Sequence, residues 1–255
     1  MKQIEWINTS TIYGAVTLKD NEAPEANNMA LHVCQNPEDV MINRKNLSEF
    51  LQLPLENWIL PWQKHTDQFA CARLENRSQG AFDKNTSIMD VDAIYTTEPN
   101  LLIGVFTADC VGMLVIDETT PFIGAIHSGW KGTTQAITTK CIQAWIQQGL
   151  IHPEHTTVFF SPSILFDSLE VGLEVVEQIQ KLPFNTSPYI RYTSNNKAYI
   201  DNQGLNFKML TNEGILPDHC HLSSLDTKKE IQDCFSYRND KKTGEHFTYG
   251  FIKKS

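Results

Sequence analysis

Short apolar runs alternate with amphipathic stretches along this chain. Near-continuous apolar runs of four to eight residues are typical of strands that are buried on both faces. Such runs predict strands at 12–18, 101–107, 111–117 and 121–128. The proline-containing segment 58–64 is also predicted to be extended. The C-terminal segments 221–226, 231–238 and 246–252 alternate in the way that half-buried strands do.

Apolar residues recur every four positions in the longer stretches between these runs. In one of them Ile137, Cys141 and Trp145 share a face, and Gly149 follows where a helix would end. This periodicity predicts helices at 37–52, 133–148, 170–182 and 204–214. Strands and helices are mixed rather than strictly alternating, and there is no internal repeat or long linker. We therefore expect one α/β domain over residues 1–255, a layered sandwich of mixed β-sheets with covering helices.

Composition narrows the classes of protein that this chain can belong to. Of 255 residues, 41% are hydrophobic, which excludes intrinsic disorder. The net charge of −9 argues against nucleic-acid and anionic-membrane partners, while it allows a small anionic substrate in a local basic pocket. No apolar run approaches the ~18 residues of a membrane span, and the first residues lack the apolar stretch of a signal peptide. We expect a cytoplasmic monomer that acts on a small molecule, with its six cysteines as thiols.

Three residues stand out as candidate metal ligands: His65, Cys110 and His127. Cys110 and His127 each follow a predicted buried strand, and such strand ends are where α/β folds place their sites. Two imidazoles and one thiolate make a three-ligand zinc site with an open fourth position. The glycine-rich nucleotide loops, the HExxH zinc motif and the zinc-deaminase signature are absent from the sequence.

A second interpretation of the same residues needs no metal. Cys110 would be a nucleophile, His127 its general base, and Asp109 the group that orients the imidazole, as in a cysteine hydrolase or amidase. The spacing of these residues matches no general metal motif, so the sequence by itself leaves both interpretations open.

Other polar residues have weaker claims to a site. Arg44, Lys131 and Arg238 are candidate cations of an anion pocket, against the simpler interpretation that each is a surface charge. His219 and His221 would share one face of a strand and could hold a metal, although a solvated strand face is the simpler interpretation. The His152–His155 segment is expected to be a polar loop.

Eight segments of the sequence resemble those of a known family, the YfiH-like proteins, also called laccase-domain or multicopper polyphenol oxidase proteins. The matching segments are EDVMINR (38–44), LPWQKHTDQF (60–69), VDAIYTTE (91–98), FTADCVGMLVID (106–117), GAIHSGWKGT (124–133), SPSILFDSLEVG (161–172), YIDNQGLNFKMLTNEGI (199–215) and FSYRNDKKTGE (235–245). They span almost the whole chain.

The resemblance implies a single α/β domain whose metal ligands are His65, Cys110 and His127, with zinc as the usual metal and copper as another. It also implies purine nucleoside chemistry: phosphorolysis of adenosine, inosine and methylthioadenosine, and deamination of adenosine. Asp109 would orient a ligand or carry a proton, and Arg44, Lys131 and Arg238 would contact phosphate or ribose. An amidase acting on cell-wall precursors and a catalytically weakened metal-binding protein remain alternatives.

Two features qualify what the resemblance implies. Laccase chemistry needs a mononuclear copper and a trinuclear cluster, and eight histidines without the corresponding motifs make a copper-dependent polyphenol oxidase the weaker alternative. The chain also departs from the family pattern around the ligands, where glycine, cysteine, tyrosine and arginine are expected. The departures are Ser161, Leu165, Ser168, Leu169, Asp226 and Glu245. They affect the expected substrate and rate rather than metal binding.

Overall fold

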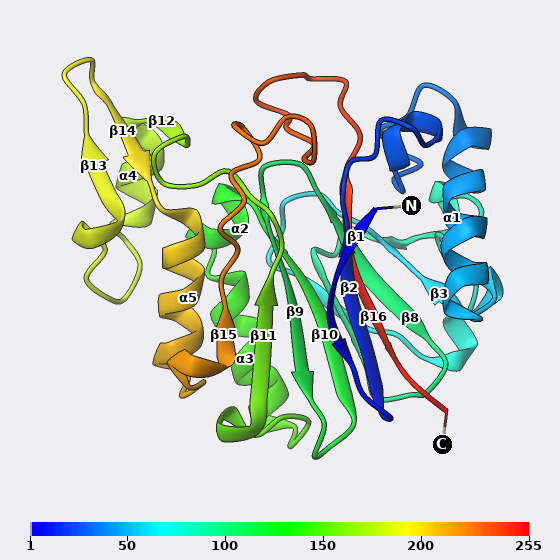
Figure 1. The fold of residues 1–255 in the computed structure, drawn as a ribbon. Helices are drawn as coiled ribbons and strands as arrows, with labels where there is room; N and C mark the ends of the chain where they lie inside the picture. Colours follow the sequence, from blue (N-terminus) through cyan, green and yellow to red (C-terminus); the bar gives the residue numbers. More distant parts are fainter. Residues whose placement is uncertain (1, 255) are drawn as a thin grey trace.

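Two β-sheets packed face to face form the centre of the protein in the computed structural model, which describes residues 2–254 (Figure 1). The five-stranded sheet has the order β1 (Gln3–Asn8), β2 (Ile12–Thr17), β16 (His246–Ile252), β8 (Leu102–Thr107), β3 (Trp58–Ile59). The six-stranded sheet has the order β15 (Cys220–His221), β11 (Thr156–Phe160), β9 (Val111–Asp117), β10 (Phe122–Ser128), β7 (Ala93–Thr96), β5 (Phe69–Cys71). Neighbouring strands are mostly antiparallel, with parallel pairs at the sheet edges.

Smaller elements surround these sheets. A three-stranded sheet has the order β12 (Glu170–Gly172), β14 (Lys197–Ile200), β13 (Ile190–Tyr192), and β4 (Pro61–Trp62) pairs with β6 (Ile88–Met89). The helices are α1 (Pro37–Leu51), α2 (Trp130–Thr134), α3 (Ile137–Gln147), α4 (Leu173–Ile179) and α5 (Asn202–Asn212). Short 3₁₀ turns lie at Pro24–Asn27, Leu55–Asn57, Leu74–Asn76, Lys84–Thr86, Pro153–His155, Ser187–Tyr189 and Pro217–His219.

The apolar core of the sandwich has three layers, and a fourth cluster of buried residues lies around α4 and β14. Ile103 of β8 and Leu114 of β9 belong to the layer between the two large sheets. On the outer side of the six-stranded sheet, Met113 packs with Trp145 of α3 and Leu210 of α5. On the outer side of the five-stranded sheet, α1 packs against the aromatic residues of β2 and β16. Figure 1 shows the resulting order, helix, sheet, sheet, helix, which confirms the predicted mixed α/β sandwich.

Most predicted elements form, and four predictions are wrong. Of the strand predicted at 221–226, only His221 belongs to a strand, β15. The helix predicted at 133–148 is two helices, because Ala136 adopts a left-handed φ of 57° between α2 and α3. The first residues of the helix predicted at 170–182 form β12 instead. No strand forms at 231–238, where side chains from elsewhere accept backbone N–H groups: His246 Nε2 accepts that of Phe235 and Asp109 Oδ2 accepts that of Arg238. This segment belongs to a long loop, residues 222–245, that arches over one end of the sheets (Figure 1).

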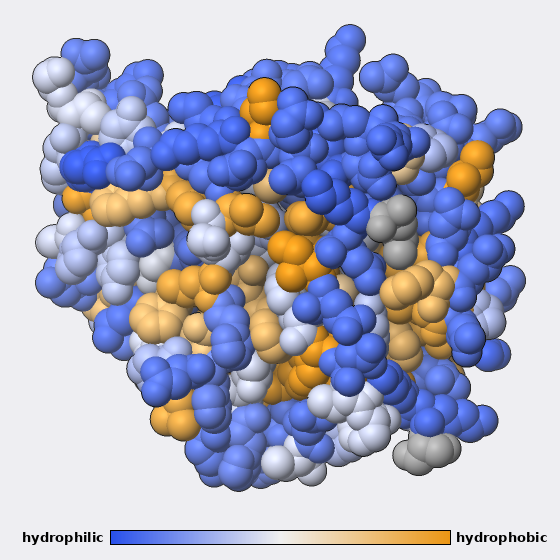
Figure 2. Space-filling view, viewed as in Figure 1, coloured by the Kyte–Doolittle hydropathy of each residue, from blue (hydrophilic) through white to orange (hydrophobic). Residues whose placement is uncertain are grey.

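The chain crosses between the two large sheets at one turn, residues 108–110. β8 lies in the five-stranded sheet, whereas β9, the next strand, lies in the six-stranded sheet. Asp109 has a φ of 78° in this turn, a conformation that asparagine and aspartate tolerate better than most residues. The crossing places residues 108–110 at the end of the sandwich beneath the 222–245 loop, where the surface is mostly hydrophilic (Figure 2). No helix among residues 2–254 is long and apolar enough to span a membrane.

We predict that His246 makes the fold sensitive to acid. Its Nδ1 bonds the Thr17 carbonyl at 2.9 Å and its Nε2 accepts the Phe235 N–H at 3.0 Å, so the neutral ring satisfies both nitrogens. Burial lowers the pKa of His246 from 6.5 to about 4. Between these values the unfolded chain binds a proton that the folded chain does not, so stability falls as pH falls, by roughly 3 kcal/mol in total.

Denaturant unfolding between pH 7 and 4 measures this effect. We expect His246→Gln to show a shallower loss of unfolding free energy over this range than the unmodified protein. Equal slopes in the two proteins would show that His246 does not couple folding to pH.

Candidate metal centre

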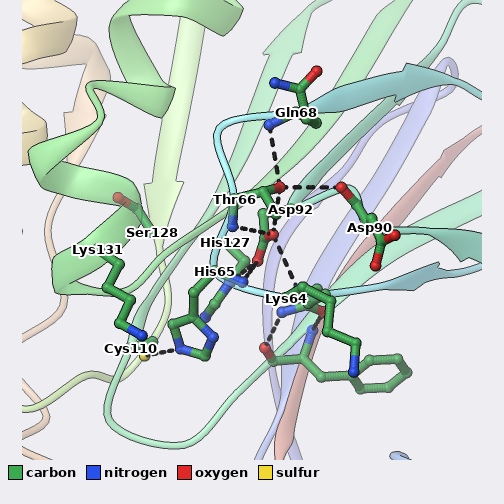
Figure 3. A network of polar contacts seen from close by, with 12 residues as sticks. Lys64, His65, Thr66, Gln68, Asp90, Asp92, Cys110, His127, Ser128 and Lys131 are labelled. Atoms are coloured by element: carbon green, nitrogen blue, oxygen red, sulfur yellow. Dashed lines mark hydrogen bonds and ion pairs between the residues drawn. The ribbon is translucent and has the colours of Figure 1, made fainter.

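The three predicted ligands come together at the end of the sandwich. His65 lies in the loop after β4, Cys110 is the last residue of the crossing turn, immediately before β9, and His127 lies near the end of β10. Their ligand atoms all lie within 4.8 Å of one another, and Cys110 Sγ is 3.8 Å from His65 Nε2. The two imidazole rings meet edge to face, with centroids 4.8 Å apart (Figure 3). His65 is exposed, Cys110 half-buried and His127 buried, so the cluster is accessible from one side.

A buried carboxylate, Asp92, holds two of these ligands in place. Asp92 Oδ1 bonds His127 Nδ1 at 2.7 Å and accepts the backbone N–H of His65 at 3.0 Å. Its Oδ2 accepts the N–H groups of Lys64 and Thr66 and the Thr66 hydroxyl, at 3.1, 2.6 and 2.8 Å (Figure 3). Because Asp92 occupies Nδ1 of His127, Nε2 is left to coordinate a metal, an arrangement common in metal sites. Sequence reasoning missed Asp92, although it lies within the VDAIYTTE segment.

The same carboxylate explains the backbone conformation of His65. His65 has a φ of 57°, in the left-handed region that side chains with a Cβ rarely adopt. Three successive N–H groups, those of Lys64, His65 and Thr66, converge on Asp92. These charge-assisted hydrogen bonds offset the backbone strain and fix the direction of the imidazole.

The electrostatics of the cluster favour charged side chains. Burial opposes the pKa shifts of Asp92, Cys110 and His127, but hydrogen bonds outweigh the effect of burial. The bond from His127 lowers the pKa of Asp92 to about 2, and the bonds to Asp92 and Cys110 raise the pKa of His127 to about 10. The two histidines lower the pKa of Cys110 to about 7. A thiolate is therefore available near neutral pH, both as a metal ligand and as a nucleophile.

The backbone beside the cluster leaves no room for a side chain at Gly129. A Cβ added to Gly129 would lie 2.8 Å from Cys110 Sγ and 2.8 Å from His65 Cδ2. Zinc bound by sulfur at ~2.3 Å and nitrogen at ~2.0 Å requires donor atoms as close as those found here. The donor set, its spacing and this cradle therefore fit zinc, and imidazole with thiolate also suits copper.

We predict that Gly129→Ala weakens metal binding. The added methyl group would press on two of the three ligands, so the zinc affinity should fall by roughly tenfold or more, as it does when ligand orientation is disturbed. Gly132→Ala is the matched control, because its Cβ would meet Ile137 Cγ2 at 3.3 Å and would touch no ligand side chain, the His127 carbonyl lying at 3.7 Å. Competition with a zinc chelator measures both variants, and unchanged affinity in Gly129→Ala would contradict the proposed cradle.

Two pockets adjoin the cluster. The larger, about 390 Å³, is lined by all three ligands together with His32, Phe106 and Glu245. The second, about 350 Å³, is lined by His65 and Cys110 together with Asp109, Trp130, Asn202 and Arg238. Tyr237 and Lys241 of the 222–245 loop line both, with the Lys241 ammonium 3.9 Å from the Tyr237 ring centroid. Trp130, Tyr237 and Lys241 were not among the sequence candidates for the site.

Asp109 accepts hydrogen bonds from the 222–245 loop rather than from any of the three candidate metal ligands. Its Oδ1 accepts the Thr227 hydroxyl at 2.6 Å and its Oδ2 accepts the backbone N–H of Arg238 at 2.6 Å. The carboxylate that orients His127 is Asp92, so the expectation that Asp109 plays this part is corrected. Asp109 still lines the second pocket beside Cys110.

The three candidate cations have different surroundings. Arg44 is 2% exposed and donates to the carbonyls of Met29, Gly80 and Ala81, so the expected substrate contact is corrected to a structural role. Lys131 is exposed on α2, with its ammonium 5.7 Å from the Trp130 ring centroid. Arg238 lines the second pocket, and its guanidinium donates twice to the Glu170 carbonyl at 3.1 Å.

The six residues that depart from the family pattern lie in different surroundings. The buried Ser168 hydroxyl donates a hydrogen bond to Asp226 Oδ2 at 2.5 Å, so these two departures from the family pattern interact directly with each other. Ser161 is buried and accepts the Gly112 N–H at 3.0 Å, and Leu169 lines the second pocket. The Leu165 carbonyl accepts the N–H groups of the turn that follows it. Glu245 lines the larger pocket and pairs with His32.

The remaining histidine strings lie apart from this cluster. His221 stacks on Phe159 at 4.8 Å, and His152 lies 3.5 Å from Asp117. Among residues 2–254, His65, Cys110 and His127 are the one group of three or more such side chains arranged to hold a metal ion.

Fold and site together define an α/β protein in which His65, Cys110 and His127 are arranged so that they could hold a metal ion, at the end of two facing sheets. Residues 16–253 match the family described as multi-copper polyphenol oxidoreductase laccase, and the chain belongs to that family. Similar solved structures agree. A Bacillus licheniformis protein titled YfiH has a TM-score of 0.91 at 28% identity, covering 95% of this chain and 93% of that one.

Two relatives carry the name purine nucleoside phosphorylase. A protein named purine nucleoside phosphorylase YlmD from Geobacillus stearothermophilus is 31% identical over 85% of this chain and 79% of its own length. A Bacillus subtilis protein of the same name is 27% identical over 91% of this chain and 84% of its own length. The solved structure of YlmD from Geobacillus stearothermophilus has a TM-score of 0.90 at 29% identity, covering 96% of this chain and 93% of that one.

Proposed function

We propose that this protein is a zinc-dependent enzyme of purine nucleosides. It would cleave adenosine, inosine and methylthioadenosine with phosphate, and deaminate adenosine with water. The observation that carries the proposal is the His65–Cys110–His127 cluster, which opens to two pockets rather than being closed by a fourth protein ligand. The names of the relatives support the substrate class.

Different residues of the protein would serve different steps of the proposed reactions. Bound zinc would supply a Lewis acid at the open coordination position. Asp92 keeps His127 in the orientation that coordination requires, and Cys110 contributes the charge of a thiolate. Arg238 and Lys241 provide positive charge for phosphate at the second pocket, to which the nearby ammonium of Lys131 adds. Asp109, in the wall of that pocket, would carry a proton to or from the purine.

A product screen tests this proposal. Inosine with phosphate should yield hypoxanthine and ribose 1-phosphate, and adenosine without phosphate should yield inosine and ammonia. Both reactions should stop when zinc is chelated and return when zinc is restored. Absence of turnover of all three nucleosides by zinc-loaded protein would overturn the proposal.

One observation favours a second candidate function. The lowered pKa of Cys110 and its closeness to both histidines would also suit a metal-free cysteine hydrolase or amidase. Such an enzyme would stay active after chelation and lose activity when Cys110 is alkylated. Loss of turnover in every sample from which zinc has been chelated would exclude this candidate.

A further inference from the structure

The larger pocket contains one carboxylate among the described residues that line it, that of Glu245. Glu245 immediately precedes β16, and its backbone N–H donates to Asn28 Oδ1 at 3.1 Å. Its side chain is 19% exposed. A carboxylate fixed in this way at the wall of a pocket needs hydrogen-bond donors or a positive charge to face it.

His32 positions this carboxylate. His32 Nε2 lies 3.0 Å from Glu245 Oε2. The His32 ring meets Phe106 edge to face at 5.8 Å and lies 6.1 Å from the Trp62 ring, so aromatic side chains hold it on two sides. Glu245 Oε2 is buried beside His32 and accepts no hydrogen bond from the described residues, so the other carboxylate oxygen, Oε1, is the one left for donors from a ligand.

The second pocket is the more positive of the two. Arg238 and Lys241 line it together with the carboxylate of Asp109, whose two oxygens already accept hydrogen bonds from the 222–245 loop, whereas Lys241 and Glu245 line the larger pocket. An anion such as phosphate is attracted to the Arg238 guanidinium and repelled by the Glu245 carboxylate. A neutral group that carries hydroxyl donors has the reverse preference, because a carboxylate only accepts hydrogen bonds.

We propose that Glu245, positioned by His32, binds the vicinal hydroxyl groups of ribose in the larger pocket, and that phosphate enters the second pocket. This inference rests on the proposed function, because it assumes a nucleoside substrate. A carboxylate that accepts hydrogen bonds from ribose hydroxyls is a familiar solution in nucleotide-binding proteins. It makes Glu245 a specificity-determining residue, which selects ribonucleosides over deoxynucleosides.

Calorimetric titration of zinc-loaded protein without phosphate tests this assignment. Inosine is the ligand, because it cannot be deaminated and is not phosphorolysed without phosphate. We expect inosine to bind at least about tenfold more tightly than 2′-deoxyinosine or 3′-deoxyinosine, as charged hydrogen bonds would give. Glu245→Gln should remove most of that difference by weakening inosine alone.

Two further variants separate positioning from general damage. His32→Gln should weaken inosine and leave the deoxynucleosides unchanged, whereas a purely structural role would weaken all three equally. Arg238→Gln should weaken inorganic phosphate and preserve the discrimination between inosine and 2′-deoxyinosine. His152→Gln, which alters a histidine near a carboxylate away from both pockets, is the matched control.

The outcomes distinguish this inference from the proposed function. Equal affinity for inosine and the deoxynucleosides in the unmodified protein would overturn the inference, and this comparison needs no variant. Undiminished discrimination in both Glu245→Gln and His32→Gln would also overturn it, and in both cases nucleoside binding would still stand. Failure of every nucleoside to bind would overturn the proposed function and the inference together.

Discussion

Cys110→Ala is expected to abolish tight zinc binding and leave the fold intact. The thiolate is the sole anionic ligand of the proposed centre, and two histidines without it make a weak zinc site. We expect the zinc affinity to fall by at least ~100-fold, a larger loss than disturbance of an outer contact produces. Cys110 lies in an accessible turn and is half-buried, so its truncation leaves no large core cavity.

Elemental analysis after gel filtration, together with thermal unfolding, measures both parts of this prediction. Cys71→Ala is the matched control, because Cys71 is also a half-buried free thiol but lies on β5. One equivalent of zinc retained by Cys110→Ala would show that the metal is bound elsewhere. Zinc lost equally from Cys71→Ala would indicate that the loss is not specific to the site.

Asp92→Asn is expected to weaken both the fold and the metal centre. Asp92 is fully buried and accepts three backbone N–H groups, one hydroxyl group and the His127 ring. An asparagine of the same size replaces one accepting oxygen with a donating NH₂ group that faces donors, and it leaves His127 without its counter-charge. Breaking a buried charge pair in this way destabilises a protein by about 4 kcal/mol.

The two consequences can be measured separately. The unfolding temperature should fall by roughly 8–16 °C for a chain of this size. The zinc affinity should fall by roughly 10–100-fold. Asp67→Asn is the control, since Asp67 pairs with Lys140 at the surface and touches no ligand. Unfolding temperature and zinc affinity that match the unmodified protein would show that Asp92 does not organise the centre.

The sequence predicted best those features that depend on burial alone. β8, β9 and β10 are buried at every position, so continuous apolar runs marked them without any knowledge of their partners. Cys110 and His127 were recognisable because they lie at the ends of those runs. What the pattern could not show is that β8 and β9 lie in different sheets, since burial on both faces looks the same in either sheet.

The features that the sequence missed depend on contacts between distant residues. Asp92 acts on backbone N–H groups 26 to 28 positions earlier, and an N–H group leaves no mark in a sequence. Arg44 was interpreted as a substrate contact because its bonds to carbonyls are equally invisible. Residues 231–238 alternate in polarity like a strand, yet the backbone N–H groups of Phe235 and Arg238 donate to the side chains of His246 and Asp109.

The 222–245 loop shows why substrate identity was the hardest feature to predict. It supplies Tyr237, Lys241 and Glu245 to the pockets, and it is held in place through Asp109. Its conformation depends on single hydrogen bonds to the crossing turn rather than on a periodic pattern. Under the proposed function, residues of this loop would determine specificity, while the sandwich beneath it would supply the metal ligands.

X-ray absorption at the zinc edge of the purified protein tests the central claim most directly. We predict one equivalent of zinc with one sulfur neighbour at ~2.3 Å and nitrogen or oxygen neighbours at ~2.0–2.1 Å, two of them from imidazole. In Cys110→Ala this signal should be lost along with the metal. A protein without bound metal, or zinc with a shell that contains no sulfur, would contradict a centre built from His65, Cys110 and His127.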